Sequence, residues 1–237
     1  MMDLNTSRLS RPPPLAGTSI QTGQVGVAES GPTPALCVAP YLVDGTRGAI
    51  QRCCTEDIVT IEFTKIDETI VKRATDVLAL AGRKNLTLVT AESCTGGLLA
   101  SVLSEAPGAG DQLQGGFMVY TKEQKTIALG LSPALLERES AVSEAVARAL
   151  AESALAHSAA DISVSITGVA GPAPDEDGNH VGLVHFAAAR RGFATIHLRR
   201  EFGDIGRGAV RYQSVMQALD LIERAAMLDD ESRQAAE

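Results

Sequence analysis

The stretch that decides the fold is LTLVTAESCTGGLLASVL, which runs from Leu86 to Leu103. Its first five residues are apolar or β-branched and have the length of a buried strand. Gly96 and Gly97 then interrupt the pattern, and the apolar residues after them recur at helical spacing. We therefore predict a strand, a glycine-containing turn and a helix in direct succession, which is the building unit of an α/β fold.

Periodic segments on both sides extend this unit. Upstream, apolar residues at helical spacing predict a helix from Asp67 to Gly82. Downstream, Ser143 is the predicted N-cap of an Ala-rich helix that runs to His157. The other predicted elements are strands at 117–120, 162–166, 181–188 and 194–200, the last two joined in a hairpin through 190–192, and helices at 122–128, 133–138 and 207–228. Because helices alternate with strands and two adjacent strands break the alternation, we expect a three-layer α/β/α sandwich with a mixed β-sheet.

The N-terminal part of the chain has a different composition. Six of the 10 prolines of the whole chain fall within the first 40 residues. They stand among Gly, Ser and Thr, and the segment has no apolar periodicity. Such a segment buries too little apolar surface to offset its chain entropy. Two short apolar runs, 35–38 and 58–61, fit either weak strands or irregular chain. We expect an irregular, disordered extension at 1–66, a domain at 67–228 and a disordered tail at 229–237.

Composition excludes several classes of function. The net charge of −8 repels a phosphate backbone, and only 3% of residues are aromatic, so we expect no nucleic-acid partner. The 4 cysteines show neither CxxC pairs nor zinc-site spacing, which favours a reducing compartment and no metal. No run of 18 uncharged apolar residues occurs, so we expect no membrane partner and a cytoplasmic protein.

The turn after the first strand contains three candidate nucleophiles, Ser93, Cys94 and Thr95. A side chain between a strand end and a helix start lies beside unpaired N–H groups and the positive end of the helix dipole. These groups can stabilise an oxyanion or bind a phosphate. Ser93 or Thr95 as a plain helix cap fits the spacing equally well.

A serine nucleophile needs a base, and the residue types offer two kinds. The four histidines have no recognisable triad context, and structural roles are the simpler interpretation for His157, His185 and His197. Lys122 and Lys125 follow a strand, and burial would bring a lysine pKa toward neutral pH. An ordinary solvated helix face is the alternative for both lysines.

Two further segments have ligand-binding potential. The loop from Thr167 to Pro172 follows a strand, where open α/β sheets place ligand contacts, although a plain turn has the same composition. Arg207 and Arg211 lie one helical turn apart and would present two positive charges on one face. Surface solvation is the alternative for this pair.

Taken in order, these segments resemble the CinA C-terminal domain family, whose stand-alone members include PncC-type nicotinamide-nucleotide amidases. The matching segments are TAESCTGG at 90–97, GFMVY at 116–120 with Lys125, Ala141-Val142-Ser143, Ala160-Asp161, TGVAGP at 167–172, Val181-Gly182, and Gly203-Asp204 with Arg207. The first segment and the TGVAGP segment are the most specific.

The resemblance implies roles for individual residues. It implies Ser93 as the nucleophile and Tyr120 and Lys125 as its catalytic partners. It implies substrate contacts at Thr95, Gly96, Gly97, Thr167, Gly168, Gly171 and Arg207. It also implies an α/β/α fold, a homodimer, and a reaction without metal or cofactor.

The chain departs from the family pattern at several positions. Ser140 replaces the usual Gly before Ala-Val-Ser, and Asn179-His180 replaces the common Lys-Pro. Leu183 stands where Thr is usual, and Ile205-Gly206 is an apparent insertion before Arg207. These departures leave the nucleophile in place and fall in segments expected to contact ribose and phosphate.

Our hypothesis is deamidation of nicotinamide mononucleotide to nicotinic acid mononucleotide and ammonia. Ser93 would attack the amide carbon, and neutral Lys125 would accept its proton directly or through Tyr120. N–H groups near Cys94 to Gly97 would hold the oxyanion, and Arg207 would hold the phosphate.

Two alternatives belong to other classes. A noncatalytic nucleotide-binding or regulatory module of the same fold is compatible with the departures at Ser140, Asn179, His180 and Leu183. A hydrolase that uses Cys94 is also compatible, because a helix N-terminus favours a thiolate.

The composition of the N-terminal extension leads to the first prediction. Deleting residues 1–60 should leave the domain folded, because this segment is Pro-rich and lacks the periodicity of a packed element. Soluble yield and the thermal unfolding midpoint of the truncated and full chains would be compared. Loss of soluble protein on deletion would contradict the assignment.

Overall fold

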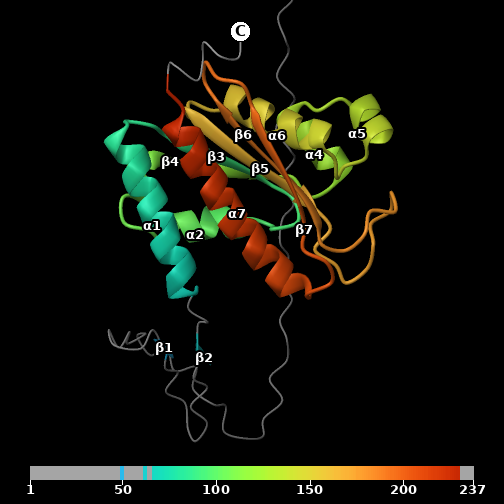
Figure 1. The fold of residues 1–237 in the computed structure, drawn as a ribbon, viewed down its shortest axis with the longest axis horizontal. Helices are drawn as coiled ribbons and strands as arrows, with labels where there is room; N and C mark the ends of the chain where they lie inside the picture. The colour runs from blue at the N-terminus through green and yellow to red at the C-terminus, as the bar shows by residue number, and fades with distance from the viewer. Residues whose placement is uncertain (1–48, 51–60, 63–65, 230–237) are drawn as a thin grey trace, which may run out of the picture. The chain divides into compact units, whose positions relative to one another are not determined.

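The computed structural model describes residues 49–50, 61–62 and 66–229 (Figure 1). The chain divides into two units, residues 1–63 and 64–237. In the first unit, β1 (Ala49–Ile50) pairs antiparallel with β2 (Ile61–Glu62). Apart from Ile66, the other residues of the predicted extension, including the run at 35–38 and residues 58–60, lie outside the described residues, as does the tail from 230 onward.

The second unit is built on a five-stranded sheet in the order β4-β3-β5-β6-β7. β3 pairs in parallel with both β4 and β5, whereas β5, β6 and β7 pair antiparallel. The strands are β3 (Leu88–Glu92), β4 (Leu113–Met118), β5 (Ile162–Gly168), β6 (Leu183–Arg190) and β7 (Ile196–Glu201). The predicted mixed sheet and the terminal hairpin are therefore confirmed.

Helices cover both faces of this sheet. The helices are α1 (Glu68–Arg83), α2 (Leu98–Ser104), α3 (Ala109–Gln112), α4 (Lys122–Leu129), α5 (Pro133–Glu139), α6 (Glu144–Ala156) and α7 (Arg207–Met227). Figure 1 shows α1, α2 and α7 on one face and α4, α5 and α6 on the other. Two separate apolar clusters fill the two interfaces, which confirms the three-layer α/β/α sandwich.

Local capping explains where the long helices begin. The Asp67 side chain accepts hydrogen bonds from the N–H groups of Thr69 and Ile70 at the start of α1. Ser143 caps α6 as predicted, because its hydroxyl accepts from the Val146 N–H at 3.3 Å. Within residues 66–229, no helix is long and apolar enough to cross a membrane.

Strand boundaries differ from the predicted ones, and β4 shows why. The sequence predicts a strand at 117–120, but β4 ends at Met118 and begins earlier, through two glycines. A Cβ atom on Gly116 would lie 2.4 Å from the Thr90 hydroxyl oxygen, so close packing of β4 on β3 requires glycine there. β-propensity disfavours this residue, so its strand position depends on a tertiary contact. The short helix α3 was not predicted.

Candidate active site

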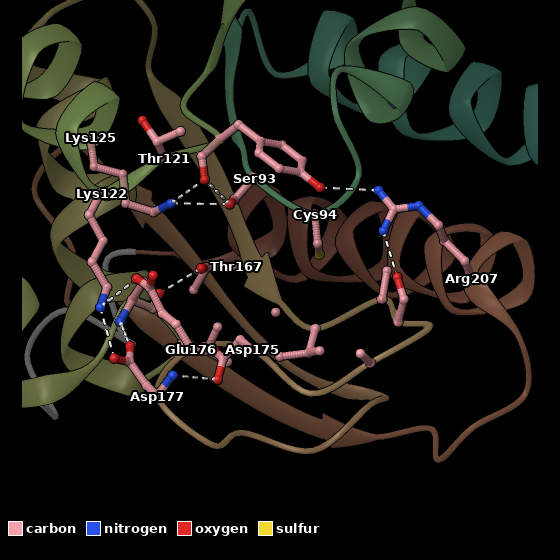
Figure 2. Close-up of a pocket in the computed structure, with 18 residues that line it drawn as sticks. Ser93, Cys94, Thr121, Lys122, Lys125, Thr167, Asp175, Glu176, Asp177 and Arg207 are labelled. Atoms are coloured by element: carbon pink, nitrogen blue, oxygen red, sulfur yellow. Dashed lines mark hydrogen bonds and ion pairs between the residues drawn. The ribbon is translucent and has the colours of Figure 1, made fainter.

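A cavity of about 390 Å³ lies at the sheet edge where the parallel strands end (Figure 2). Ser93 follows β3, Tyr120 follows β4, and Thr167 and Gly168 end β5, so three neighbouring strands deliver these residues to one place. This is the edge where open α/β sheets bind ligands. The remaining lining residues are Cys94, Thr121, Lys122, Lys125, Ala141, Val142, Val169, Ala170, Gly171, Ala173, Asp175, Glu176, Asp177 and Arg207.

Ser93 is held rigidly in the turn between β3 and α2. Its N–H donates to the Ile166 carbonyl of β5 at 3.0 Å, and its carbonyl accepts from Gly96 at 3.0 Å. Gly96 and Gly97 have φ values of 61° and 89°, a backbone conformation that favours glycine. The turn thereby aims a side chain that is only 7% exposed into the cavity.

Lys125 of α4 supplies the amine that meets this hydroxyl. Its Nζ lies 3.1 Å from Ser93 Oγ and donates to the carbonyls of Val119 at 2.9 Å and Tyr120 at 3.3 Å. The side chain is 1% exposed, and all three partners are uncharged oxygens. Burial lowers the pKa of Lys125 to about 8, the charge of Lys122 acts in the same direction, and Cys94 opposes it.

The neutral form of Lys125 fits this environment. A neutral amine has two N–H donors, which match the two carbonyls, and one lone pair, which can accept the Ser93 hydroxyl proton. Because the pKa lies near 8, a substantial fraction of the amine is neutral at physiological pH. The pair is therefore a serine and a base within hydrogen-bond distance of each other.

Tyr120 contributes its backbone to this pair. Its carbonyl accepts from both Ser93 Oγ at 3.4 Å and Lys125 Nζ. Its hydroxyl accepts instead from the Arg207 guanidinium at 3.1 Å, and the residue is 53% exposed. The direct contact of Ser93 with Lys125 thus favours direct proton transfer over a relay through the phenol.

Arg207, the first residue of α7, lies across the cavity from Lys122 in Figure 2. One guanidinium nitrogen donates to the Gly171 carbonyl at 2.7 Å, and the other donates to the Tyr120 hydroxyl. The charge is therefore oriented by two loops and remains exposed to solvent at the cavity edge.

The loop after β5 lines the cavity mainly with backbone. The Thr167 hydroxyl donates to the Ala141 carbonyl at 2.7 Å, so this side chain is already hydrogen-bonded within the protein. A Cβ on Gly168 would lie 2.7 Å from the Leu183 carbonyl oxygen. A Cβ on Gly171 would lie 2.9 Å from Val181. These glycines are thus required for packing as well as for the shape of the cavity.

The three residues predicted as contacts at the helix start, Thr95, Gly96 and Gly97, do not line this cavity. At the same helix start, the buried Glu92 carboxylate accepts hydrogen bonds from the Leu99 and Ala100 N–H groups of α2. A carboxylate of the protein itself thus satisfies these two N–H groups, which an anionic ligand would otherwise contact.

Sequence reasoning also missed the acidic side of the cavity. The Lys122 amine lies 2.8 Å from carboxylate oxygens of both Glu176 and Asp177. These contacts, to Asp177 first, raise the pKa of Lys122. Lys122 and these two carboxylates are more than 50 residues apart in the sequence, so no local pattern indicates their pairing. The only sign in the sequence is the acidic run DED at 175–177.

Two residues that depart from the family pattern, Ser140 and Asn179, are hydrogen-bonded to each other beside Asp177. Ser140 has φ 67° and ψ 155°, a backbone region that is almost exclusive to glycine. Its hydroxyl donates to Asp177 at 2.8 Å and accepts from the Asn179 amide at 2.9 Å. The Ser140 hydroxyl, which a glycine would lack, therefore connects the acidic loop (residues 175–179) to the turn before α6.

The other candidate nucleophile and base have less suitable environments. Burial raises the pKa of the Cys94 thiol to about 12, so it carries its proton at neutral pH. His185 and His197 contact each other at 3.0 Å on β6 and β7, outside the cavity lining. His157 is the C-cap of α6, in agreement with the predicted structural role.

Comparison with known proteins places this geometry in a family. The sequence profile of the CinA C-terminal domain matches residues 70–226. A CinA-like protein of Synechococcus sp. is 45% identical over 150 residues, which cover 63% of this chain and 36% of that protein. A CinA-like protein of Acidobacterium capsulatum is 34% identical over 194 residues, covering 82% and 45%. The chain thus spans less than half the length of these two curated relatives.

Solved structures agree with the sequence comparison. The competence/damage inducible protein CihA of Agrobacterium tumefaciens is 34% identical, with a TM-score of 0.65 over 69% of this chain and 99% of that one. A CinA superfamily protein of Escherichia coli, also 34% identical, has a TM-score of 0.63 over 70% and 95%. Sequence and structure agree over the same segment, and the chain belongs to the CinA C-terminal domain family.

Proposed function

We propose that this chain is an amidohydrolase that deamidates nicotinamide mononucleotide to nicotinic acid mononucleotide and ammonia. The observation that supports the proposal most strongly is the contact of Ser93 Oγ with Lys125 Nζ at 3.1 Å. A buried amine whose pKa is about 8, beside a hydroxyl at the end of a strand, is a base suited to activating that hydroxyl near neutral pH.

The reaction begins with attack of Ser93 Oγ on the carboxamide carbon while Lys125 Nζ accepts the hydroxyl proton. The N–H group of Cys94, which directly follows Ser93 and belongs to the cavity lining, is the candidate donor to the oxyanion. When the C–N bond breaks, Lys125 returns the proton to the leaving nitrogen and ammonia departs. Water then attacks the acyl-enzyme, Lys125 accepts its proton, and the acid is released as Ser93 regains its hydrogen.

The charges around the cavity favour one orientation of a mononucleotide. Arg207 lies at one side as an exposed cation, and Lys122 at the other is already paired with Glu176 and Asp177. A phosphate therefore has its better partner in Arg207. The cavity of about 390 Å³ lies in the size range of small-molecule sites, between roughly 300 and 1,000 Å³.

Single substitutions in the turn should separate the serine enzyme from its two alternatives. Ser93→Ala should abolish ammonia release from nicotinamide mononucleotide, while calorimetric affinity stays within about tenfold, because only the attacking oxygen is lost. Cys94→Ala is the matched control and should keep most of the activity. An inactive Cys94→Ala variant would assign the reaction to the thiol. Binding without any turnover in the unmodified protein would identify a noncatalytic module.

The pKa of Lys125 should be visible in the pH dependence of the rate. As pH falls below about 8, a growing fraction of the amine is protonated and cannot accept the Ser93 proton, so kcat/KM should rise with pH and level off above about 8. Lys125→Met removes the amine and should abolish the activity, and Lys125→Arg should not restore it, because guanidinium stays protonated. A rate that is flat between pH 6 and 9 in the wild type would exclude Lys125 as the base.

Phosphate recognition by Arg207 should appear as a difference between two substrates. Arg207→Ala should raise KM for the mononucleotide by about ten- to a hundredfold, because a charge-assisted contact contributes roughly 1.5–3 kcal/mol. The phosphate-free riboside is the control, and its KM should change little. Equal effects on the two substrates would show that Arg207 orders the loops instead of binding phosphate.

A further inference from the structure

Glu92 is a buried acid directly before the nucleophile, and the mechanism above leaves it without a role. It is the last residue of β3 and is 1% exposed. Its two carboxylate oxygens accept from the Ala100 N–H at 2.8 Å and from the Leu99 N–H at 3.0 Å. A third contact, from the Thr90 hydroxyl, is 3.4 Å long. All three donors are uncharged, so two backbone N–H groups and one hydroxyl satisfy the carboxyl oxygens.

The carboxylate closes the turn that carries Ser93. The N-cap of α2 is Gly97, which has no side chain to satisfy the first N–H groups of the helix. Glu92 satisfies two of them from the other end of the turn, so Ser93 lies between the acid and the helix that the acid caps. Because Gly96 and Gly97 are both flexible residues, this cross-link restricts the path of the chain between them.

The backbone of the same residue fixes the other member of the pair. The Glu92 carbonyl accepts from the Val119 N–H at 2.8 Å. The Val119 carbonyl in turn accepts from Lys125 Nζ at 2.9 Å. Glu92 is thus connected to the hydroxyl through the turn and to the amine through Val119.

From these contacts we infer that Glu92 is a positioning residue, which aligns Ser93 with Lys125 by capping α2 from within the sheet. The inference depends on the proposed pairing of Ser93 with Lys125. Glu92 does not line the cavity, and the hydrogen bonds of its carboxylate go to Thr90, Leu99 and Ala100 and not to Ser93 Oγ or Lys125 Nζ. Its carboxylate acts through the turn, and its replacement should slow the reaction of Ser93 without changing what binds.

Two variants of Glu92 test the inference. Glu92→Gln keeps the size but turns an amide N–H₂ toward one of the helix N–H groups, so at most one of the two bonds survives. Glu92→Asp keeps the charge but is one methylene too short to hold both donors. The control is Asp161→Asn, because the Asp161 carboxylate also accepts two bonds, from the Thr87 N–H at 2.8 Å and its hydroxyl at 2.9 Å, at the opposite end of β5.

The measurement is the covalent modification of Ser93 by a fluorophosphonate probe, followed by intact-mass spectrometry, with Ser93→Ala as the unlabelled reference. Thermal unfolding midpoints set a temperature at which all the variants are folded. We expect the limiting labelling rate to fall at least tenfold in Glu92→Gln and by a smaller factor in Glu92→Asp, with the half-saturating probe concentration unchanged. Asp161→Asn should stay within about twofold of the wild type even if its unfolding midpoint falls.

The outcomes separate this inference from the proposed function. If the wild type is not labelled at Ser93, the proposed function fails, and the positioning role fails with it. If the wild type is labelled and Glu92→Gln reacts as fast, or no slower than Asp161→Asn, only the positioning role is overturned. If neither Glu92 variant yields folded protein, Glu92 is a residue of folding, which also overturns the inference.

Discussion

The burial of the Lys125 amine is the constraint on which the site depends. An ammonium that exchanges water for two carbonyls and a hydroxyl loses much of its solvation, so the proton is held less tightly. None of the hydrogen bonds of the Lys125 amine goes to a carboxylate, and two of the cavity carboxylates, those of Glu176 and Asp177, are paired with Lys122, one turn away on α4. A carboxylate beside Lys125 would raise its pKa and remove the base. On α4, Lys122 is thus paired with two carboxylates, whereas the Lys125 amine is bonded only to uncharged oxygens.

A similar contrast applies to the two helix starts at this edge of the sheet. α2 begins beside the nucleophile, but the Glu92 carboxylate already satisfies two of its N–H groups. α7 begins with Arg207, after a glycine N-cap without a side-chain hydrogen bond. A carboxylate of the protein thus occupies the start of α2, whereas Arg207 leaves an exposed cation at the cavity edge at the start of α7.

The acidic loop shows how departures from a family pattern can compensate each other. A non-glycine residue with the backbone angles of Ser140 carries a cost of order 1–3 kcal/mol. Its hydroxyl bonds to Asp177 and Asn179 connect it to the loop that also holds Lys122. Ser140 and Asn179 therefore belong to one hydrogen-bonded network with Asp177, which lines the cavity.

Local pattern was enough to predict the α/β/α layers, the mixed sheet, the Ser143 cap and the strand–turn–helix unit, because periodicity and capping depend on neighbours in the chain. For the site, residue types alone left three nucleophiles and two lysines open, and the family resemblance selected Ser93 and Lys125. Only the tertiary structure decided that the Tyr120 phenol contacts Arg207, that Glu92 satisfies the start of α2, and that Thr95 to Gly97 do not line the cavity. These outcomes depend on which strand ends and helix starts are adjacent in space. Local periodicity and capping do not specify these long-range neighbours.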